Sequence, residues 1–156
     1  KLGVKAPSLY NHLSGLKELS LGVAKLALSR LEDAIRNAAV GRSKGDALMA
    51  IALTYRKFAK ENPELYKAIL RFPDYSDSNI QEAGHAVVRI LYQVMEPYHY
   101  GKEETIHFVR GFRSALHGFV SLEAAGFFQS AEADVDESFE RFILRLLSTL
   151  NTTEGV

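Results

Sequence analysis

Apolar residues recur in steps of three and four along nearly the whole chain, and no segment alternates apolar with polar residues as a half-buried strand would. This pattern predicts an all-α fold. The first long helix should bury one stripe of side chains and end near Gly41. That stripe consists of Ala24, Leu28, Leu31, Ile35 and Ala38.

Turn and capping residues set the bounds of the later helices. Residues 78–81 have the sequence of a capping box, which predicts the start of a helix that ends before Pro97. The longest uninterrupted helix is expected to run from about Lys102 to Phe128. Asp134 is expected to cap the last helix.

The composition limits the class of protein. At 156 residues, of which 47% are hydrophobic, the chain can bury one compact core. It has no cysteine, which excludes disulfides and thiolate sites and fits a reducing compartment. No apolar run approaches the roughly 18 residues that cross a bilayer, and the first residues lack a signal-peptide pattern. We therefore expect a soluble, cytoplasmic protein with no membrane partner.

Charge is balanced over the chain but uneven along it. The formal net charge is zero, which gives no general reason to expect a nucleic acid partner. Locally, Lys1, Lys5 and Lys17 precede the first acidic residue, Glu18, whereas residues 132–140 are acidic. Any phosphate-binding surface should therefore lie near the N-terminus, and on charge alone it is weak.

Residues 6–13 are expected to form a short helix with a polar outer face. Two leucines four residues apart can bury, which leaves Ser8, Asn11 and His12 facing outward. A helix-turn-helix module places such a helix in the major groove, where Asn can bond adenine and Ser, Tyr, His and Lys can reach base edges or phosphates. The alternative is a short surface helix that is only solvated.

Two stretches resemble a known family. Around the short helix, Gly3-Val4, Ser8-Leu9-Tyr10, His12, Gly15 and Leu19 resemble the recognition helix and following turn of the TetR/AcrR family of bacterial transcriptional regulators. Residues 116–123 are similar to the branch of that family whose C-terminal domain is named for Trp-His-Gly, with Leu116 in place of the Trp.

The resemblance implies a DNA-binding transcriptional regulator of this domain order. Residues 1–19 correspond to the C-terminal part of the helix-turn-helix domain, residues 20–150 to a helical ligand-binding and dimerisation domain, and residues 151–156 to a polar tail. The residues expected to contact operator DNA are Lys5, Ala6, Ser8, Tyr10, Asn11, His12 and Lys17.

The match departs from the family in three respects. The chain begins inside the turn, so we expect the family's first helix and most of its second to be missing, and this part alone to bind DNA weakly. Lys5 stands where the family usually has a capping Ser, and Leu16 where it usually has a phosphate-contacting Lys. Lys17 is the neighbouring residue that can take the latter role.

The resemblance also implies a homodimeric repressor that responds to a small molecule. The long helix after residue 101 and the last helix of each subunit are expected to form a four-helix interface, and a ligand in the core to change the spacing of the two DNA-reading heads. The residues expected at the dimer interface are Leu116, Phe119, Val120, Leu122, Phe139, Phe142, Ile143 and Leu146.

Polar residues beside the apolar stripes favour a ligand cavity independently of the family. On the long helix His107, Arg110, Ser114, His117 and Ser121 recur in steps of three and four. If this helix packs antiparallel to the one before it, His85 lies opposite Arg113. Such a mixed face suits a cavity with a few polar anchors. The candidate ligand-binding residues are Tyr55, Phe58, His85, Arg89, Tyr92, Arg113 and His117.

Other interpretations stay open. The two faces can be solvated, and Tyr55 and Phe58 can be plain core. A metal-binding bundle is the main rival, because Glu82 to His85 and Glu104 to His107 are both Glu-x-x-His, the motif of ferritin-like carboxylate proteins. In an antiparallel hairpin, however, His85 and His107 are offset by about 9 Å along the axis.

A mononuclear site formed by Glu82, His85 and His117 remains a further alternative. A third class is an all-α interaction module, which predicts no cavity between residues 80–96 and 102–128. Nucleophilic catalysis has no support, because the chain has neither cysteine nor a Gly-x-Ser-x-Gly turn. We expect no enzymatic activity and no cofactor.

Overall fold

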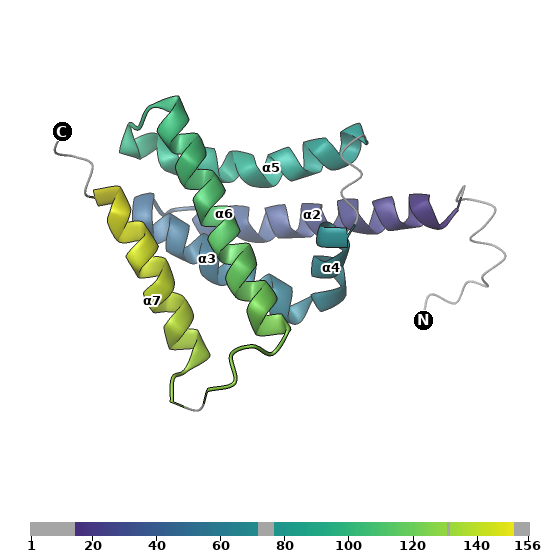
Figure 1. The fold of residues 1–156 in the computed structure, drawn as a ribbon. Helices are drawn as coiled ribbons and strands as arrows, with labels where there is room; N and C mark the ends of the chain where they lie inside the picture. The colour runs from purple at the N-terminus through teal and green to yellow at the C-terminus, as the bar shows by residue number, and fades with distance from the viewer. Residues whose placement is uncertain (1–14, 72–76, 131, 152–156) are drawn as a thin grey trace.

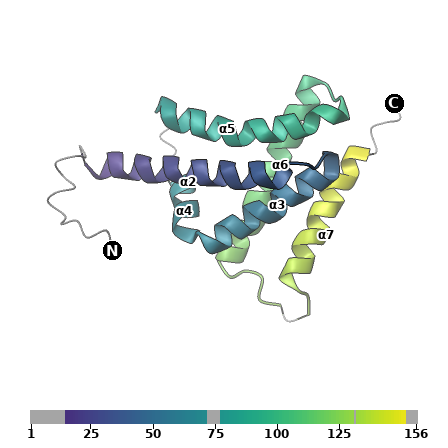
Figure 2. The same cartoon turned by 180° about the vertical axis from the view of Figure 1, so that it is seen from behind.

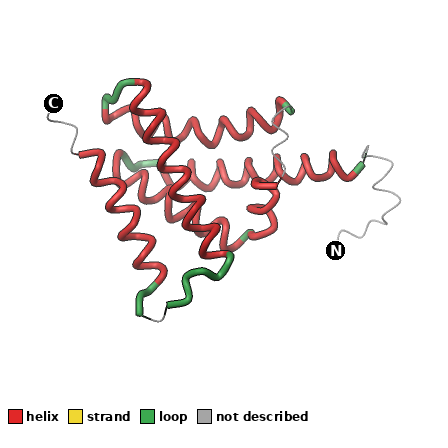
Figure 3. Tube along the Cα trace, viewed as in Figure 1, coloured by secondary structure: helices red, strands yellow, loops and turns green. Residues whose placement is uncertain are grey.

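The computed structural model describes residues 15–71, 77–130 and 132–151, without the side chains of residues 16, 17 and 151 (Figure 1). The short helix expected at residues 6–13 lies outside the described residues. So do six of the seven residues expected to contact DNA and the side chain of the seventh, Lys17. Within the described part every regular element is a helix, which confirms the all-α fold class (Figure 3).

Six α-helices and two short 3₁₀ helices make up the described fold. Their bounds are α2 Leu16–Ala39, α3 Lys44–Glu61, α4 Pro63–Arg71, α5 Ser78–Met95, η1 Glu96–Tyr98, α6 Lys102–Ala124, α7 Val135–Ser148 and η2 Thr149–Asn151. The boundary expected between residues 19 and 20 therefore lies inside one continuous helix, α2.

The helix expected to be the longest is shorter than predicted. α6 has 23 residues and ends at Ala124 rather than Phe128, whereas α2 has 24. Gly126 adopts a positive φ of 76° just beyond the end of α6. In this left-handed conformation its N–H donates to the Glu123 carbonyl, and the Phe127 N–H donates to the Leu122 carbonyl. Glycine is favoured at this position because it has no Cβ atom and so adopts the left-handed conformation that ends the helix without steric strain.

Two aspartates cap helices. The Asp77 carboxylate accepts hydrogen bonds from the backbone N–H groups of Asn79, at 2.9 Å, and Ile80, at 3.2 Å. The prediction that Ser78 caps α5 is therefore wrong by one residue, because an aspartate immediately before it provides the acceptor. Asp134 caps α7 as predicted, accepting from the Glu137 N–H at 2.8 Å.

The helices cross rather than form a regular up-and-down bundle. α2 and α5 lie side by side, α6 crosses α5 at a steep angle, and α7 runs antiparallel along α6 (Figures 1 and 2). The predicted antiparallel packing of α5 and α6 is therefore wrong. Between them, η1 and the left-handed His99, with φ 58°, redirect the chain. The Tyr100 hydroxyl donates to the Leu150 carbonyl, which holds the start of α6 beside the end of α7.

One main hydrophobic core joins α2, α3, α5, α6 and α7. Phe112 of α6 and Phe139 of α7 are its largest fully buried side chains. The stripe predicted on α2 is buried at Ala24, Leu28, Leu31 and Ile35 and partly buried at Ala38. None of the helices in the described ranges combines the length and the apolar character needed to span a membrane.

Candidate ligand-binding site

A cavity of about 410 Å³ lies among α2, α3, α4, α5 and α6. This volume is within the range of roughly 300–1,000 Å³ that is typical of small-molecule pockets. Most of its wall is aliphatic. The aliphatic wall consists of Leu28, Leu31 and Ile35 of α2, Ile51 of α3, Ile69 and Leu70 of α4, Val87 and Leu91 of α5, and Leu116 of α6.

Polar side chains enter the cavity mainly from α6. Arg110, Arg113, Ser114 and His117 line it, and their spacing of three, one and three residues places them on one face of the helix. Tyr55 of α3 adds a fifth polar group. Gly84 of α5 also lines the cavity, and no neighbouring atom lies within 4 Å of the position of a Cβ there. The polar groups therefore converge on one part of an otherwise apolar space.

A chain of hydrogen bonds connects two residues of the cavity wall, Tyr55 and His117, through Tyr66 of α4. The Tyr55 and Tyr66 hydroxyls are 3.1 Å apart, and the Tyr66 hydroxyl is 2.9 Å from Nδ1 of His117. The two tyrosine rings meet edge to face, with centroids 5.8 Å apart. The Ser121 hydroxyl lies 3.5 Å from the same His117 nitrogen. These contacts hold Tyr55 and His117 in place as fixed polar points of the cavity wall.

Both tyrosines stay protonated at neutral pH. Burial raises the pKa of Tyr55 far above its ordinary value, the neighbouring Tyr66 raises it further, and the nearby Arg113 offsets part of the rise. Burial also raises the pKa of Tyr66, while hydrogen bonds with Tyr55 and Ser121 partly lower it. The Tyr55 hydroxyl is therefore a neutral hydrogen-bonding group beside a permanent cation.

The two cavity arginines have no carboxylate partner among the described residues. Arg36, Arg56, Arg89 and Arg141 each form an ion pair with an Asp or Glu in that same part of the chain. No carboxylate of the described ranges comes within ion-pair distance of Arg110 or Arg113. A guanidinium group cannot lose its charge in a protein. The polar part of the cavity is therefore positively charged.

The predicted ligand-binding residues divide into two groups. Tyr55, Arg113 and His117 line the cavity, where their side chains can make polar contacts with a ligand. The other four do not line it, and their prediction needs correction. Phe58 is buried in the main core, and Arg89 pairs with Glu82 at 2.8 Å.

Two more of the predicted residues are also misplaced, because α5 is rotated relative to the expected hairpin. It presents Gly84, Val87 and Leu91 to the cavity, so His85 and Tyr92 lie on its exposed side. The sequence of α5 does distinguish these two faces, because Gly84, Val87 and Leu91 belong to its apolar stripe and His85 and Tyr92 do not.

Sequence reasoning missed part of the cavity wall. Arg110 and Ser114 were in the polar stripe but not in the predicted binding set, although they continue the spacing of Arg113 and His117. That spacing was the usable signal. The contribution of α2 and α4 had no signal, because Leu28, Leu31 and Ile69 have the same pattern as core residues.

The two rival interpretations gain no support from the described residues. Glu82 pairs with Arg89, and His117 is hydrogen-bonded to Tyr66. His107 lies near Glu103 of its own helix, at 3.7 Å. Within the ranges that the structure describes, no three His, Asp or Glu side chains are grouped to hold a metal ion. The interaction module predicted no cavity between the segments that form α5 and α6, and the cavity contradicts it.

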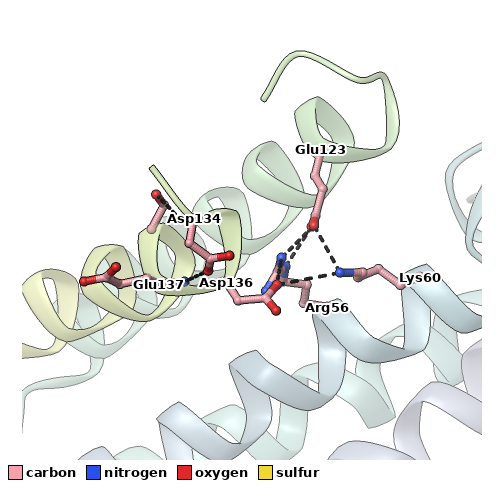
Figure 4. A network of polar contacts seen from close by, with 7 residues as sticks. Arg56, Lys60, Glu123, Asp134, Asp136 and Glu137 are labelled. Atoms are coloured by element: carbon pink, nitrogen blue, oxygen red, sulfur yellow. Dashed lines mark hydrogen bonds and ion pairs between the residues drawn. The ribbon is translucent and has the colours of Figure 1, made fainter. Parts of the chain in front are cut away.

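A second polar cluster lies away from the cavity. We call Arg56, Lys60, Glu123 and Asp136 the Arg56 network (Figure 4). Nε of Arg56 donates to Glu123 at 2.7 Å, and its Nη2 donates to Glu123 and Asp136 at 2.6 Å each. Nζ of Lys60 is 3.3 Å from Glu123 and 3.8 Å from Asp136. The network ties α3 to the end of α6 and the start of α7.

Arg56 is desolvated on its other side as well. Only 6% of the residue is exposed, and its guanidinium lies 5.0 Å from the Phe139 ring centroid and 5.7 Å from that of Phe119. Hydrogen bonding to Arg56 is the main reason why the pKa values of Glu123 and Asp136 are lowered. Nothing in the sequence indicates this network, because Glu123 and Asp136 are 67 and 80 residues from Arg56.

The residues predicted for the dimer interface are of two kinds. Leu116, Val120, Phe139 and Ile143 are buried within the single chain, so they form the core beneath α6 and α7 and not their outer surface. Their assignment to the interface needs this correction, because a wide apolar arc in the sequence includes both the inner and the outer sides of a helix. Leu122 and Phe142 are exposed, and Phe119 and Leu146 are partly buried.

Two further large apolar residues, one after α6 and one on α7, are exposed. Phe127 is 72% exposed and Leu144 is 58% exposed. Behind them Phe119 lies among Phe128, Phe139 and Phe142, with ring centroids 4.8 to 6.1 Å away. We call Leu122, Phe127, Phe142 and Leu144 the α6–α7 apolar surface.

Comparison with known proteins places this all-helical fold in a class of transcriptional regulators. Residues 48–146 match the family model of the tetracyclin repressor-like C-terminal domain. The chain is 32% identical over 158 residues to the uncharacterized HTH-type transcriptional regulator Rv0681 of Mycobacterium tuberculosis, covering 99% of this chain and 72% of that protein. It is 34% identical over 151 residues to the uncharacterized HTH-type transcriptional regulator YobS of Bacillus subtilis, covering 96% and 78%.

Two solved structures share the fold. A crystal structure of a candidate regulatory protein, SCO4313, superposes with a TM-score of 0.78 at 24% identity, covering 94% of this chain and 81% of that one. A protein of unknown function from Rhodococcus sp. RHA1 gives a TM-score of 0.71 at 23% identity, covering 95% and 77%. The chain belongs to the TetR family of HTH-type transcriptional regulators, which confirms the family resemblance. It is therefore a regulator and not an enzyme.

Proposed function

We propose that the protein is a ligand-responsive, homodimeric repressor that binds operator DNA, with the cavity as its effector site. The observation that carries the proposal is the course of α2. This helix is unbroken from Leu16 to Ala39, and Leu28, Leu31 and Ile35 on it line the cavity. Its N-terminal end extends beyond the other described helices (Figures 1 and 2), and in the sequence it directly follows the segment expected to read DNA. A ligand in the cavity therefore contacts the helix that continues from that segment.

The DNA-contacting part of the proposal comes from the sequence and the family. Asn11 and Ser8 have the chemistry to read base edges, and Lys5 and Lys17 to contact phosphates. Tyr10 and His12 can do either, and Ala6 can contact a thymine methyl group or the backbone. The names of both relatives as HTH-type regulators support DNA as the partner.

The experiment is a gel shift with a protein that carries this chain and a complete helix-turn-helix, on the DNA upstream of its own gene. Asn11→Ala should cost about 1–3 kcal/mol and relax the preference at one base pair. Lys17→Ala should weaken binding to all sequences alike. Lys25→Ala, at an exposed position farther along α2, is the control. Equal loss on all sequences for Asn11→Ala, or binding without any sequence preference, contradicts the proposal.

The α6–α7 apolar surface supports the homodimer. Large exposed apolar side chains on neighbouring helices are typical of interaction sites, and a closed twofold pair buries the same surface on both subunits. A charge at Leu144 or Phe142 should therefore produce monomers in sedimentation velocity. Leu144→Glu is the cleaner variant because this side chain is 58% exposed, so its replacement leaves the core intact. Unchanged dimers in both variants would exclude this surface.

A further inference from the structure

We propose that the cavity binds an aliphatic carboxylic acid, with the carboxylate between Arg110 and Arg113 and the hydrocarbon chain against the aliphatic wall. The inference rests on the proposed function, in that it gives a ligand class to the proposed effector site. It depends on three features of the cavity: the positive charge of its two arginines, the aliphatic side chains of its wall, and the absence of Asp and Glu among the described residues that line it.

The charge of the cavity favours an anion. Arg110 and Arg113 are three residues apart on α6, so their side chains are neighbours on the helix surface and their like charges repel. An anion between them relieves this repulsion. The planar guanidinium fork matches a carboxylate with two parallel hydrogen bonds. Arg56 already binds a carboxylate of this chain in that way, through two nitrogens to Glu123.

No acidic side chain competes for the arginines. The described residues that line the cavity include no Asp or Glu. Ser114 and His117 lie on the same face of α6 as the arginines and line the same cavity. These groups can bond a carboxylate oxygen without charge repulsion. A cationic ligand meets only repulsion here, and a neutral ligand leaves both guanidinium groups without a counter-charge.

The side chains of the cavity wall indicate the chemistry of the apolar part of the ligand. The wall is formed by leucine, isoleucine and valine side chains from five helices, while Tyr55 and His117 are the ring-bearing members of the lining within the described residues. Both rings are held by hydrogen bonds to Tyr66. Each CH₂ group of a ligand that is buried against this wall strengthens binding. A flexible alkyl chain therefore suits this wall better than a flat aromatic system.

The test compares three probes with the same eight-carbon chain. Octanoate, octan-1-ol and octylamine are titrated into the purified protein by isothermal calorimetry. Octanoate should bind about tenfold more tightly than octan-1-ol, because charge-assisted hydrogen bonds are roughly twice as strong as neutral ones. Octylamine should bind more weakly than the alcohol.

Variants of the two arginines test whether they cause the preference for octanoate over octan-1-ol. The double substitution Arg110→Met and Arg113→Met keeps the aliphatic stems and removes the charges, so octanoate should lose its advantage while octan-1-ol keeps its affinity. Arg113→Lys keeps the charge but loses the fork, and it should retain part of the preference. Arg145→Met, an exposed arginine on α7, is the matched control and should bind all three probes as the parent does.

Several results overturn the inference: equal binding of octanoate and octan-1-ol, no binding of either, or a double variant that still prefers octanoate. The gel shift separates this failure from failure of the proposed function. Specific DNA binding without an octanoate preference refutes the ligand class alone. An arginine-dependent octanoate preference without specific DNA binding refutes the repressor and leaves the ligand class standing.

Discussion

Arginine occurs in two contrasting settings in this molecule. Arg56 is buried, forms hydrogen bonds with two carboxylates and lies against two aromatic rings. Arg110 and Arg113 are exposed at a cavity, and no carboxylate of the described residues pairs with them. In the sequence all three are arginines on amphipathic helices. The contrast teaches that the partners of a charge, and not its residue type, separate an arginine that holds helices together from one that is free to bind a ligand.

The largest expected effect is on the Arg56 network. Arg56→Met should lower the free energy of unfolding by about 2–4 kcal/mol, because it leaves the partly buried Glu123 with only the exposed Lys60 and Asp136 around it. Urea denaturation measures this loss. Lys57→Met, which breaks an exposed pair with Glu61 on the same helix, is the control and should change stability by less than about 0.5 kcal/mol. If Arg56→Met lowered the free energy of unfolding as little as Lys57→Met does, the Arg56 network would not stabilise the packing of α3 against α6 and α7.

Acid should weaken the same network to a smaller extent. The folded-state pKa values of Glu123 and Asp136 lie below their ordinary values of 4.5 and 3.8, chiefly because both accept hydrogen bonds from Arg56. Their contribution to stability is therefore complete above about pH 4.5 and is lost as the pH falls through the lowered folded values. Urea denaturation between pH 6 and pH 3 measures the loss.

The double variant Glu123→Gln and Asp136→Asn is the control for the acid effect. It should be less stable than the parent at pH 6 and should show a smaller further loss in acid. If the parent and the double variant lose stability equally below pH 4.5, other carboxylates cause the acid sensitivity.

The smallest expected effect is at the cavity. Arg113→Met should change the free energy of unfolding by less than about 0.5 kcal/mol, because no carboxylate of the described residues loses a partner and the side chain is exposed. The same urea titration as for Arg56→Met measures it. A loss comparable to that of Arg56→Met would mean that Arg113 is a structural residue, and the contrast between the two settings would fail.

The sequence was informative wherever the physical cause is local. Helix periodicity predicted the all-α class, and Asp134 was correctly placed as a cap because an N-cap depends on the three residues that follow it. The polar stripe on α6 placed Arg113 and His117 on one helix face, and both line the cavity, because positions on one face follow from spacing alone; their role in ligand binding stays a prediction.

Features that depend on the relative placement of helices could not be predicted. His85 and Tyr92 were misplaced because the cavity lies against the apolar stripe of α5, with Gly84, Val87 and Leu91, and not against the mixed face beside it. Phe139 and Ile143 were assigned to a surface because an apolar arc does not separate core from interface. Arg56 had no signal, since its partners come from helices that adjoin α3 only in the folded chain.

The continuity of α2 has a mechanical consequence. A helix of 24 residues is about 36 Å long, and about 22 Å of it separates Leu31 in the cavity wall from its first residue. Such a rod acts as a lever, so a tilt of only about 5° at the cavity moves its far tip by about 2 Å. In the proposed pair the two tips move together, against a target whose half-sites are fixed about 34 Å apart.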